Sequence, residues 1–190
     1  EQVFPAGVRS TAEHFALVAT GGFGRGVLAP FSDVDLLFLT PWRETPRHEQ
    51  VVEFMLYMLW DLGLKVGHAT RSVDECLKQA RADVTVRTSL LDARFLAGDA
   101  EVFQDFAQKF RADCTAAGAA KFIAAKRAER AARHAKFGDS AYLVEPNIKE
   151  GKGGLRDLQT LFWEARYALG VSRVADLASA TFLVGQETGG

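Results

Sequence analysis

The stretch that decides the fold is Gly21–Leu39, which reads GGFGRGVLAPFSDVDLLFL. An apolar run at residues 15–20 precedes its glycines, and a second apolar run at residues 33–39 ends it. Short apolar runs bounded by glycine or proline predict buried strands. Glycines directly after a buried strand let a ligand approach the backbone, because no Cβ stands in the way. The exposed N–H groups of such a turn can bind phosphate.

Two aspartates open the second predicted strand. Asp33 and Asp35 are two residues apart, so strand alternation places both carboxylates on one face, with Val34 and Leu36 on the other. Paired carboxylates beside a phosphate-binding turn suit a hard divalent ion such as Mg²⁺. Such an ion can activate an attacking oxygen and neutralise a triphosphate. The pattern therefore favours nucleotidyl transfer over a plain glycine turn before an acidic edge strand.

Two other nucleotide-binding motifs fit this stretch less well. Gly22–Val27 resembles the dinucleotide-binding pattern G-x-G-x-x-G, but its last position is Val27, and Pro30 comes too soon for a long crossover helix. A Walker loop is excluded because no Gly-Lys-Ser/Thr sequence follows. The interpretation as a nucleotidyltransferase turn is therefore retained.

Hydrophobic periodicity, capping residues and glycines divide the rest of the chain. They predict a strand at residues 64–70 and helices at residues 48–62, 72–80, 83–97, 100–114, 116–137 and 155–169. The composition changes near residue 113, with strands before it and helices after it. We therefore expect an α/β domain with a mixed sheet and flanking helices over residues 1–112, and a helical domain over residues 113–190.

The composition is that of a globular protein, since 48% of the 190 residues are hydrophobic and 25% are charged. The formal net charge of -1 argues against a general nucleic-acid binder, which needs a basic excess. No apolar run reaches the roughly 18 residues of a membrane span. Two cysteines are too few for a disulfide framework, so we expect a reducing, cytoplasmic setting. The chain begins with Glu1 rather than methionine, which suggests a fragment of a longer protein.

Residues 21–36 resemble the signature of the polymerase-β-type nucleotidyltransferase superfamily, in which a glycine turn precedes an Asp-x-Asp strand. The wider run to Leu39 is closer still to the bacterial PII-protein uridylyltransferase/uridylyl-removing family. Two further stretches carry this resemblance, WDLGLKVGH at residues 60–68 and EPNIKEGKGGLRDLQ at residues 145–159. The related glutamine-synthetase adenylyltransferases share the glycine and Asp-x-Asp signature and a stretch similar to Gly153–Asp157.

This resemblance implies a polymerase-β-like fold and transfer of UMP from UTP to a tyrosine of the PII nitrogen-regulatory protein, with release of pyrophosphate. It also implies that Asp33 and Asp35 hold Mg²⁺ and that Gly21 and Gly22 approach the UTP phosphates. Members of the family are multifunctional, with a metal-dependent hydrolase domain and glutamine-sensing domains later in the chain. No His-Asp doublet of such a hydrolase occurs here, so we expect the removing activity to be absent.

Further residues are predicted to bind the nucleotide because they lie in or beside one of two glycine turns: Gly24, Arg25, Ser32, Lys149, Lys152 and Arg156. The second turn starts a helix, where N–H groups and cations attract anions. We expect this helix start to face the aspartate pair across a cleft. A plain interdomain connection with solvated lysines is the alternative.

The third metal ligand is left open. In the superfamily a third carboxylate usually lies on a later strand beside the Asp-x-Asp strand, where the strand at residues 64–70 offers Gly67 and His68. Another acid, water or His68 could complete the site. This gap leaves a non-catalytic nucleotide-binding regulatory module as one alternative function. An adenylyltransferase that acts on glutamine synthetase is the other.

Two minor expectations concern side chains outside the motifs. Trp60 and Trp163 are expected in the core. Lys126, Arg130 and Arg133 fall on one side of the helix at residues 116–137, and this side is interpreted as a solvated face. A face that meets an acidic partner or polyphosphate is the alternative.

Overall fold

The computed structural model describes residues 14–28, 32–115, 118–137 and 147–169. The chain divides into two compact units, Glu1–Arg111 and Ala112–Gly190. The first unit contains a β-sheet, and the second is helical in its described part. Nowhere in the described residues is a helix long and apolar enough to span a membrane.

A four-stranded mixed sheet forms the centre of the first unit, which confirms the predicted fold class. Its strands are β1 (Ala16–Ala19), β2 (Val34–Thr40), β3 (Val66–Ser72) and β4 (Arg94–Gly98), in the order β3-β2-β1-β4. β1 is antiparallel to both β2 and β4, whereas β2 and β3 are parallel.

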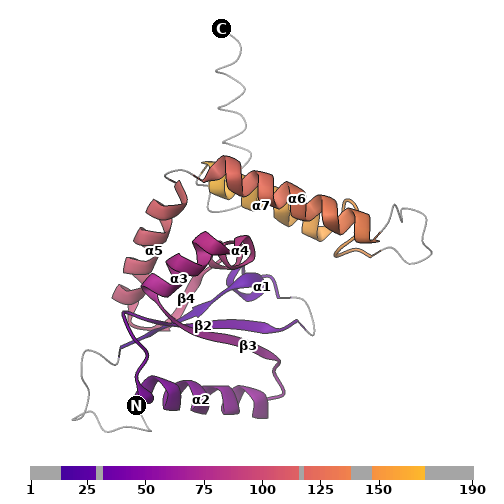
Figure 1. The fold of residues 1–190 in the computed structure, drawn as a ribbon. Helices are drawn as coiled ribbons and strands as arrows, with labels where there is room; N and C mark the ends of the chain where they lie inside the picture. The colour runs from indigo at the N-terminus through magenta and orange to yellow at the C-terminus, as the bar shows by residue number, and fades with distance from the viewer. Residues whose placement is uncertain (1–13, 29–31, 116–117, 138–146, 170–190) are drawn as a thin grey trace. The chain divides into compact units, whose positions relative to one another are not determined.

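Helices cover both faces of this sheet (Figure 1). α2 (Pro46–Asp61) connects the parallel strands β2 and β3 and lies on one face, while α3 (Val73–Ala82) and α4 (Val84–Leu91) lie on the other. A parallel pair needs such a crossover, because a tight turn cannot return the chain to the same end of the sheet. The short α1 (Gly21–Gly24) follows β1, and α5 (Ala100–Thr115) follows β4.

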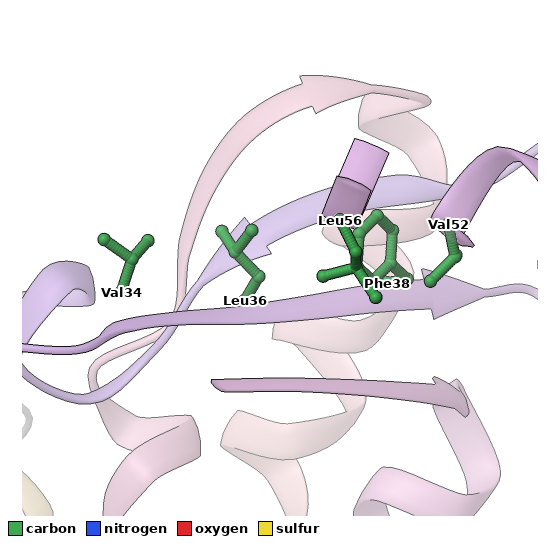
Figure 2. Close-up of a cluster of buried hydrophobic side chains, with 5 residues drawn as sticks. All are labelled: Val34, Leu36, Phe38, Val52 and Leu56. Atoms are coloured by element: carbon green, nitrogen blue, oxygen red, sulfur yellow. The ribbon is translucent and has the colours of Figure 1, made fainter. Parts of the chain in front are cut away.

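Alternation along β2 separates the core from the candidate site. The apolar side chains that β2 and α2 turn toward each other form a buried cluster: Val34, Leu36, Phe38, Val52 and Leu56 (Figure 2). The intervening residues Asp35, Leu37 and Leu39 point to the face of α3 and α4. Leu37 and Leu39 are buried there, so Asp35 is the only charged residue of a strand that is otherwise apolar up to its last residue, Thr40.

The strand register brings four chain segments to one edge of the sheet. Ala19 at the end of β1 pairs with Leu36 on one side and with Arg94 on the other, and Val34 pairs with Val66. The end of β1 and the starts of β2, β3 and β4 therefore lie at the same edge. The glycine turn and the aspartate pair belong to this edge.

Side-chain caps fix where two helices begin. The Ser72 hydroxyl accepts from the Glu75 N–H while the Glu75 carboxylate accepts from the Ser72 N–H, which is the capping box expected from the sequence. α2 begins two residues earlier than expected, because Thr45 caps it and Pro46 occupies its first turn.

The expected helix at residues 83–97 is wrong beyond Leu91. The helix ends there, Asp92 and Ala93 turn the chain, and residues 94–98 form β4 against β1. No glycine or proline marks this break in the sequence. Pairing with β1 therefore overrides a helical pattern of apolar residues, as tertiary context commonly does for strands.

The expectation that Trp60 lies in the core is wrong, because α2 exposes several apolar side chains. Trp60 is 46% exposed, and its ring packs edge-on against the ring of Tyr57. Phe54 and Met58 of the same helix are also about half exposed. Trp163, in contrast, is buried as expected.

In the second unit, α6 (Ala119–Phe137) packs against α7 (Leu155–Leu169). The rings of Phe122 and Tyr167 stack with their centroids 4.3 Å apart. Lys126 Nζ lies 4.9 Å from the centroid of the Trp163 ring and 2.8 Å from Glu129 Oε2, and Lys126 is 2% exposed. The interpretation of this α6 face as solvated is therefore wrong for Lys126, which packs on α7 through a cation–π contact, and for the mostly buried Arg133, whereas Arg130 is exposed.

A buried aspartate in the first turn of α7 ties that helix to α6. Asp157 accepts hydrogen bonds from Arg133 and from the Gly153 N–H at 2.8 Å, and His134 Nε2 lies 2.9 Å from Oδ2. Arg130 Nε lies 3.4 Å from Oδ1. Burial alone would raise the pKa of Asp157, but the hydrogen bonds bring it below its ordinary value.

Replacing Asp157 with asparagine should destabilise the second unit by more than about 1 kcal/mol, because the charge that compensates the mostly buried Arg133 is lost. Since the pKa of Asp157 lies below 3.8 in the folded state, its stabilising effect is present above about pH 4 and is lost as the pH falls through the lowered pKa. Thermal unfolding from about pH 7 down to about pH 2 measures this.

The exposed Asp105→Asn is the matched control, and it should behave as wild type. The wild-type and Asp157→Asn melting temperatures should converge in acid. A constant difference between them across the whole range would contradict the assignment.

Candidate active site

The candidate active site lies at the sheet edge where β1 ends and where β2 and β3 begin. Asp35 is the second residue of β2 and is half-buried, and the exposed Asp33 immediately precedes the strand. The Thr20 N–H donates to the Asp35 backbone oxygen at 3.0 Å, and Gly67 is the register partner of Asp35 on β3. The aspartate pair therefore lies directly beside the turn that follows β1.

Two glycines make the room that the Asp35 carboxylate occupies. A Cβ on Gly21 would lie 2.8 Å from Asp35 Oδ2, and a Cβ on Gly67 would lie 2.8 Å from Oδ1. Both distances are too short for a carbon atom in van der Waals contact. Gly21 also has a φ of 55°, in the left-handed region that favours glycine. The carboxylate is therefore enclosed by the glycine turn on one side and by β3 on the other.

The charge of Asp35 is unfavourable in the protein alone. Burial raises the pKa of Asp35, the neighbouring Asp33 carboxylate raises it further, and the Arg25 guanidinium lowers it only in part. The result is a pKa above the ordinary value of 3.8. A hard cation bound between Asp33 and Asp35 would compensate both negative charges, including the unfavourable charge of Asp35.

The glycine turn is a single turn of helix whose carbonyl end is held from β4. Arg94 donates from Nε to the Gly24 oxygen at 3.1 Å and from Nη2 to the Phe23 oxygen at 2.9 Å. At the other end, Thr20 gives no side-chain hydrogen bond to the helix. The first N–H groups of a helix have no partner within it, so the leading N–H groups of α1 are available to a phosphate.

A buried ion pair anchors the end of this turn. Arg25 Nη1 donates to Asp92 Oδ2 at 2.5 Å, and the Asp92 side chain is completely buried. A Cβ on Gly24 would lie 2.1 Å from the Asp92 backbone oxygen and 3.0 Å from that of Ala19. Gly24 is therefore needed for close packing of α1, and Asp92 compensates part of the Arg25 charge.

Gly22 and Ser32 are not tightly enclosed by other residues. A Cβ on Gly22 would meet nothing closer than the Val27 backbone oxygen at 3.7 Å. Ser32 is exposed next to the aspartate pair. Both residues are therefore accessible to a ligand, as the sequence interpretation requires.

The third metal ligand is not supplied by a neighbouring acid in the described part of the chain, where no group of three His, Cys, Asp or Glu side chains forms a metal site. His68 is in register with Leu36, whose side chain belongs to the core under α2. Paired residues of adjacent strands point to the same face. His68 therefore points away from the face of Asp35, which removes it as the third ligand.

A cavity of about 340 Å³ lies beside Asp35, between the sheet and α4. We call it the α4 cavity. Asp35 and Leu37 of β2, Arg71 of β3 and Ser89 of α4 are among the residues that line it. This cavity could not be predicted from local sequence patterns, because its lining comes from β2, β3 and α4, which are far apart in the chain.

The second glycine turn is closed by its own backbone. A Cβ on Gly151 would lie 2.6 Å from the Asn147 oxygen, and a Cβ on Gly154 would lie 2.6 Å from the Ile148 oxygen. The Leu155 N–H donates to that same Ile148 oxygen at 2.9 Å. These glycines are therefore explained by the tight path of the chain before α7.

The three cations predicted around this turn differ in their surroundings. Arg156 contacts Glu150 at 3.3 Å and Gln159 at 3.2 Å, so its charge is already partly compensated. Lys149 and Lys152 are exposed. All three belong to the second unit, and their approach to the aspartate pair stays a prediction.

The structure separates two glycines that the sequence treats alike. Gly24→Ala should destabilise the first unit by about 1–3 kcal/mol, because its Cβ would overlap the Asp92 backbone oxygen. Gly22→Ala should melt like wild type, because its Cβ would make only ordinary van der Waals contacts, at 3.7 Å or more. Urea unfolding of both variants measures the difference. Equal midpoints for Gly22→Ala and Gly24→Ala would contradict the packing role of Gly24.

Two family descriptions match this chain. A nucleotidyltransferase domain matches residues 8–92, and the GlnD PII-uridylyltransferase family matches residues 121–189. The first match contains the glycine turn, the aspartate pair and α4, and the second contains the second glycine turn and α7.

The chain is also similar to bifunctional uridylyltransferase/uridylyl-removing enzymes. It is 56% identical to that of Azospirillum brasilense over 188 residues, which are 99% of this chain and 20% of the relative. It is 54% identical to that of Rhodopseudomonas palustris over 94% of this chain and 19% of the relative. The chain thus spans about a fifth of the length of these curated relatives. Its residues 8–92 are therefore a nucleotidyltransferase domain, and its residues 121–189 match the PII-uridylyltransferase family.

Proposed function

We propose that this chain transfers UMP from UTP to a tyrosine hydroxyl of a PII signalling protein, in the cytoplasm, with Mg²⁺ and with release of pyrophosphate. The observation that carries the proposal is the fit of the Asp35 carboxylate between Gly21 and Gly67. That fit puts a carboxylate directly against a phosphate-binding turn. The names of the relatives, uridylyltransferases by description, support uridylyl transfer over adenylyl transfer.

Asp33 and Asp35 would hold the metal ion. Their oxygens are the ligands that Mg²⁺ prefers, and the raised pKa of Asp35 marks a site where a cation relieves unfavourable charge. Nucleotidyltransferase domains generally use a divalent metal with a nucleoside triphosphate. When bound, the ion would compensate the charge that develops on the phosphoryl oxygens during transfer.

The glycine turn would bind the phosphate groups that leave as pyrophosphate. The leading N–H groups of α1 would donate to the phosphate oxygens, and a Cβ on Gly22 would meet no atom closer than 3.7 Å. Arg25 adds a guanidinium, which Asp92 holds in position at the end of the turn. Preorganised donors of this kind lower a barrier because they need no rearrangement during the reaction.

The tyrosine hydroxyl would attack the α-phosphate in line with the departing pyrophosphate. The attack requires the hydroxyl to lose its proton, and the aspartate pair is the nearest basic group that the described site offers. Lys149, Lys152 and Arg156 remain proposed contacts to the nucleotide from the second unit. If they act through charge, Lys152→Ala should weaken nucleotide binding more at low salt than at high salt.

Labelled nucleotides test the proposal. The chain is incubated with Mg²⁺, one labelled triphosphate (UTP, CTP or ATP) and either purified PII protein or glutamine synthetase. Label on PII from UTP alone is the expected result. Label on glutamine synthetase from ATP would make the chain an adenylyltransferase. Nucleotide binding without any release of pyrophosphate would make it a regulatory module.

Asp33→Asn and Asp35→Asn should each reduce uridylyl transfer by at least about a hundredfold, because each removes a charge that holds the metal. The exposed Asp61→Asn on α2 is the matched control and should keep wild-type activity. Label transfer to PII at saturating Mg²⁺ measures the loss. Near-normal transfer by either variant, with unchanged Mg²⁺ dependence, would show that the pair is not the metal site.

Asp35→Asn should raise the melting temperature of the metal-free protein at pH 7. A carboxyl whose pKa is raised on folding stabilises the fold below its unfolded pKa, near 3.8, and this stabilisation is lost as the pH rises through the raised folded pKa. The gain from the substitution should therefore vanish near pH 3, about one unit below that unfolded value. Mg²⁺ should raise the wild-type melting temperature but not that of Asp35→Asn. A variant that is less stable than wild type at pH 7 would refute the electrostatic assignment.

A further inference from the structure

The α4 cavity has mostly apolar walls. These come from three elements, β2, β3 and α4: Leu37, Ala69, Val86 and Leu90. Its volume of about 340 Å³ is at the small end of the range for ligand sites, about 300–1,000 Å³. Cavities that combine apolar walls with a few placed polar groups bind small organic ligands and fix their orientation. Because Asp35 also lines the cavity, a ligand bound there can extend to the aspartate pair.

Arg71 is the only lysine or arginine among the described residues that line the α4 cavity. It is in register with Leu39, so alternation puts its side chain on the face of Asp35. Arg71 is half-buried and forms no hydrogen bond or ion pair with another described residue, although its charge lowers the pKa of Glu75. Its guanidinium donors are therefore available to a ligand in the cavity.

We infer that the α4 cavity receives the base of the nucleotide, and that Arg71 selects uracil by donating hydrogen bonds to the C4 carbonyl of the ring. This inference rests on the proposed function, which places the phosphates of the same molecule at Asp33 and Asp35. The flat faces of the base suit the apolar walls. The uracil edge offers two carbonyl acceptors and one N–H donor, and the Ser89 or Thr85 hydroxyl can accept from that N–H.

The residues that line the cavity fit the base better than they fit the triphosphate or the acceptor tyrosine. A triphosphate carries several negative charges, which the single Arg71 guanidinium cannot compensate in a cavity that Asp35 also lines. A tyrosine ring has one polar atom, and that oxygen must be at the α-phosphate. It would make no hydrogen bond to Arg71 or to the Ser89 hydroxyl, whereas the edge of uracil can bond to both.

The same chemistry predicts discrimination between bases. Cytosine carries an amino group where uracil has a carbonyl, and an amino group cannot accept from a guanidinium. Binding CTP in the same pose would therefore place the amino group of cytosine against the N–H donors of Arg71. Sites that hydrogen-bond a specific group reject analogues that lack it much more strongly than apolar pockets reject a change of size.

Binding measurements on the 190-residue chain, with Mg²⁺ and without PII protein, test this inference. Isothermal titration calorimetry gives the affinities for UTP, CTP and inorganic tripolyphosphate. The variants are Arg71→Ala and Ser89→Ala, with the exposed Arg43→Ala as the matched control in the same unit. Wild type should prefer UTP to CTP.

Arg71→Ala should weaken UTP binding by about tenfold or more and abolish the preference over CTP, with tripolyphosphate binding unchanged. Ser89→Ala should weaken UTP binding by a few-fold in the same direction, and it decides the question if Arg71→Ala does not fold. Arg43→Ala should match wild type for all three ligands.

Three outcomes would overturn the inference, and they differ from one another. If UTP and tripolyphosphate affinities fall together, Arg71 binds phosphate rather than the base. If the preference for UTP survives in both variants while transfer to PII slows, the cavity serves the acceptor. If wild type binds no triphosphate at all, the proposed function fails, and this inference fails with it.

Discussion

The enclosure of one carboxylate by two glycines is the constraint on which the site depends. Asp35 lies where a Cβ on either Gly21 or Gly67 would collide with its oxygens. The glycine turn can therefore approach the carboxylate closely, and a phosphate at the turn would lie near a cation at the aspartates, as the proposed function requires. The cost of the arrangement is a negative charge that is partly buried beside Asp33, which a bound cation would offset.

A second layer of residues holds that arrangement in place. α1 is a single turn, and an isolated turn of helix is unstable because it forms few hydrogen bonds for the dihedral angles it fixes. Arg94 binds its carbonyls, Asp92 binds Arg25, and Gly24 packs against the backbone of Asp92. The turn is therefore supported by the chain between α4 and β4 rather than by its own sequence.

Local patterns in the sequence predicted the parts of the site that are local. The period of two along a strand placed Asp33 and Asp35 on one face, and adjacency to a buried strand identified the glycine turn. Asp92 could not be found in this way, because its partner is 67 residues away in the sequence. Arg71 could not be identified either, because only the parallel pairing of β3 with β2 puts it on the same face of the sheet as Asp35. Trp60 was misplaced because helical periodicity does not say how much of an apolar face is covered.

The pairing of β4 with β1 also has a consequence for the order of folding. The sheet is completed by joining its first and last strands, and such long-range closure is slow because chain entropy is lost before contacts compensate it. During synthesis, the glycine turn and both aspartates leave the ribosome well before the segment that anchors them. A nascent chain that ends after β3 would contain every residue of the glycine turn without the support that shapes it. Affinity for nucleotide would therefore arise at the end of folding, when β4 docks.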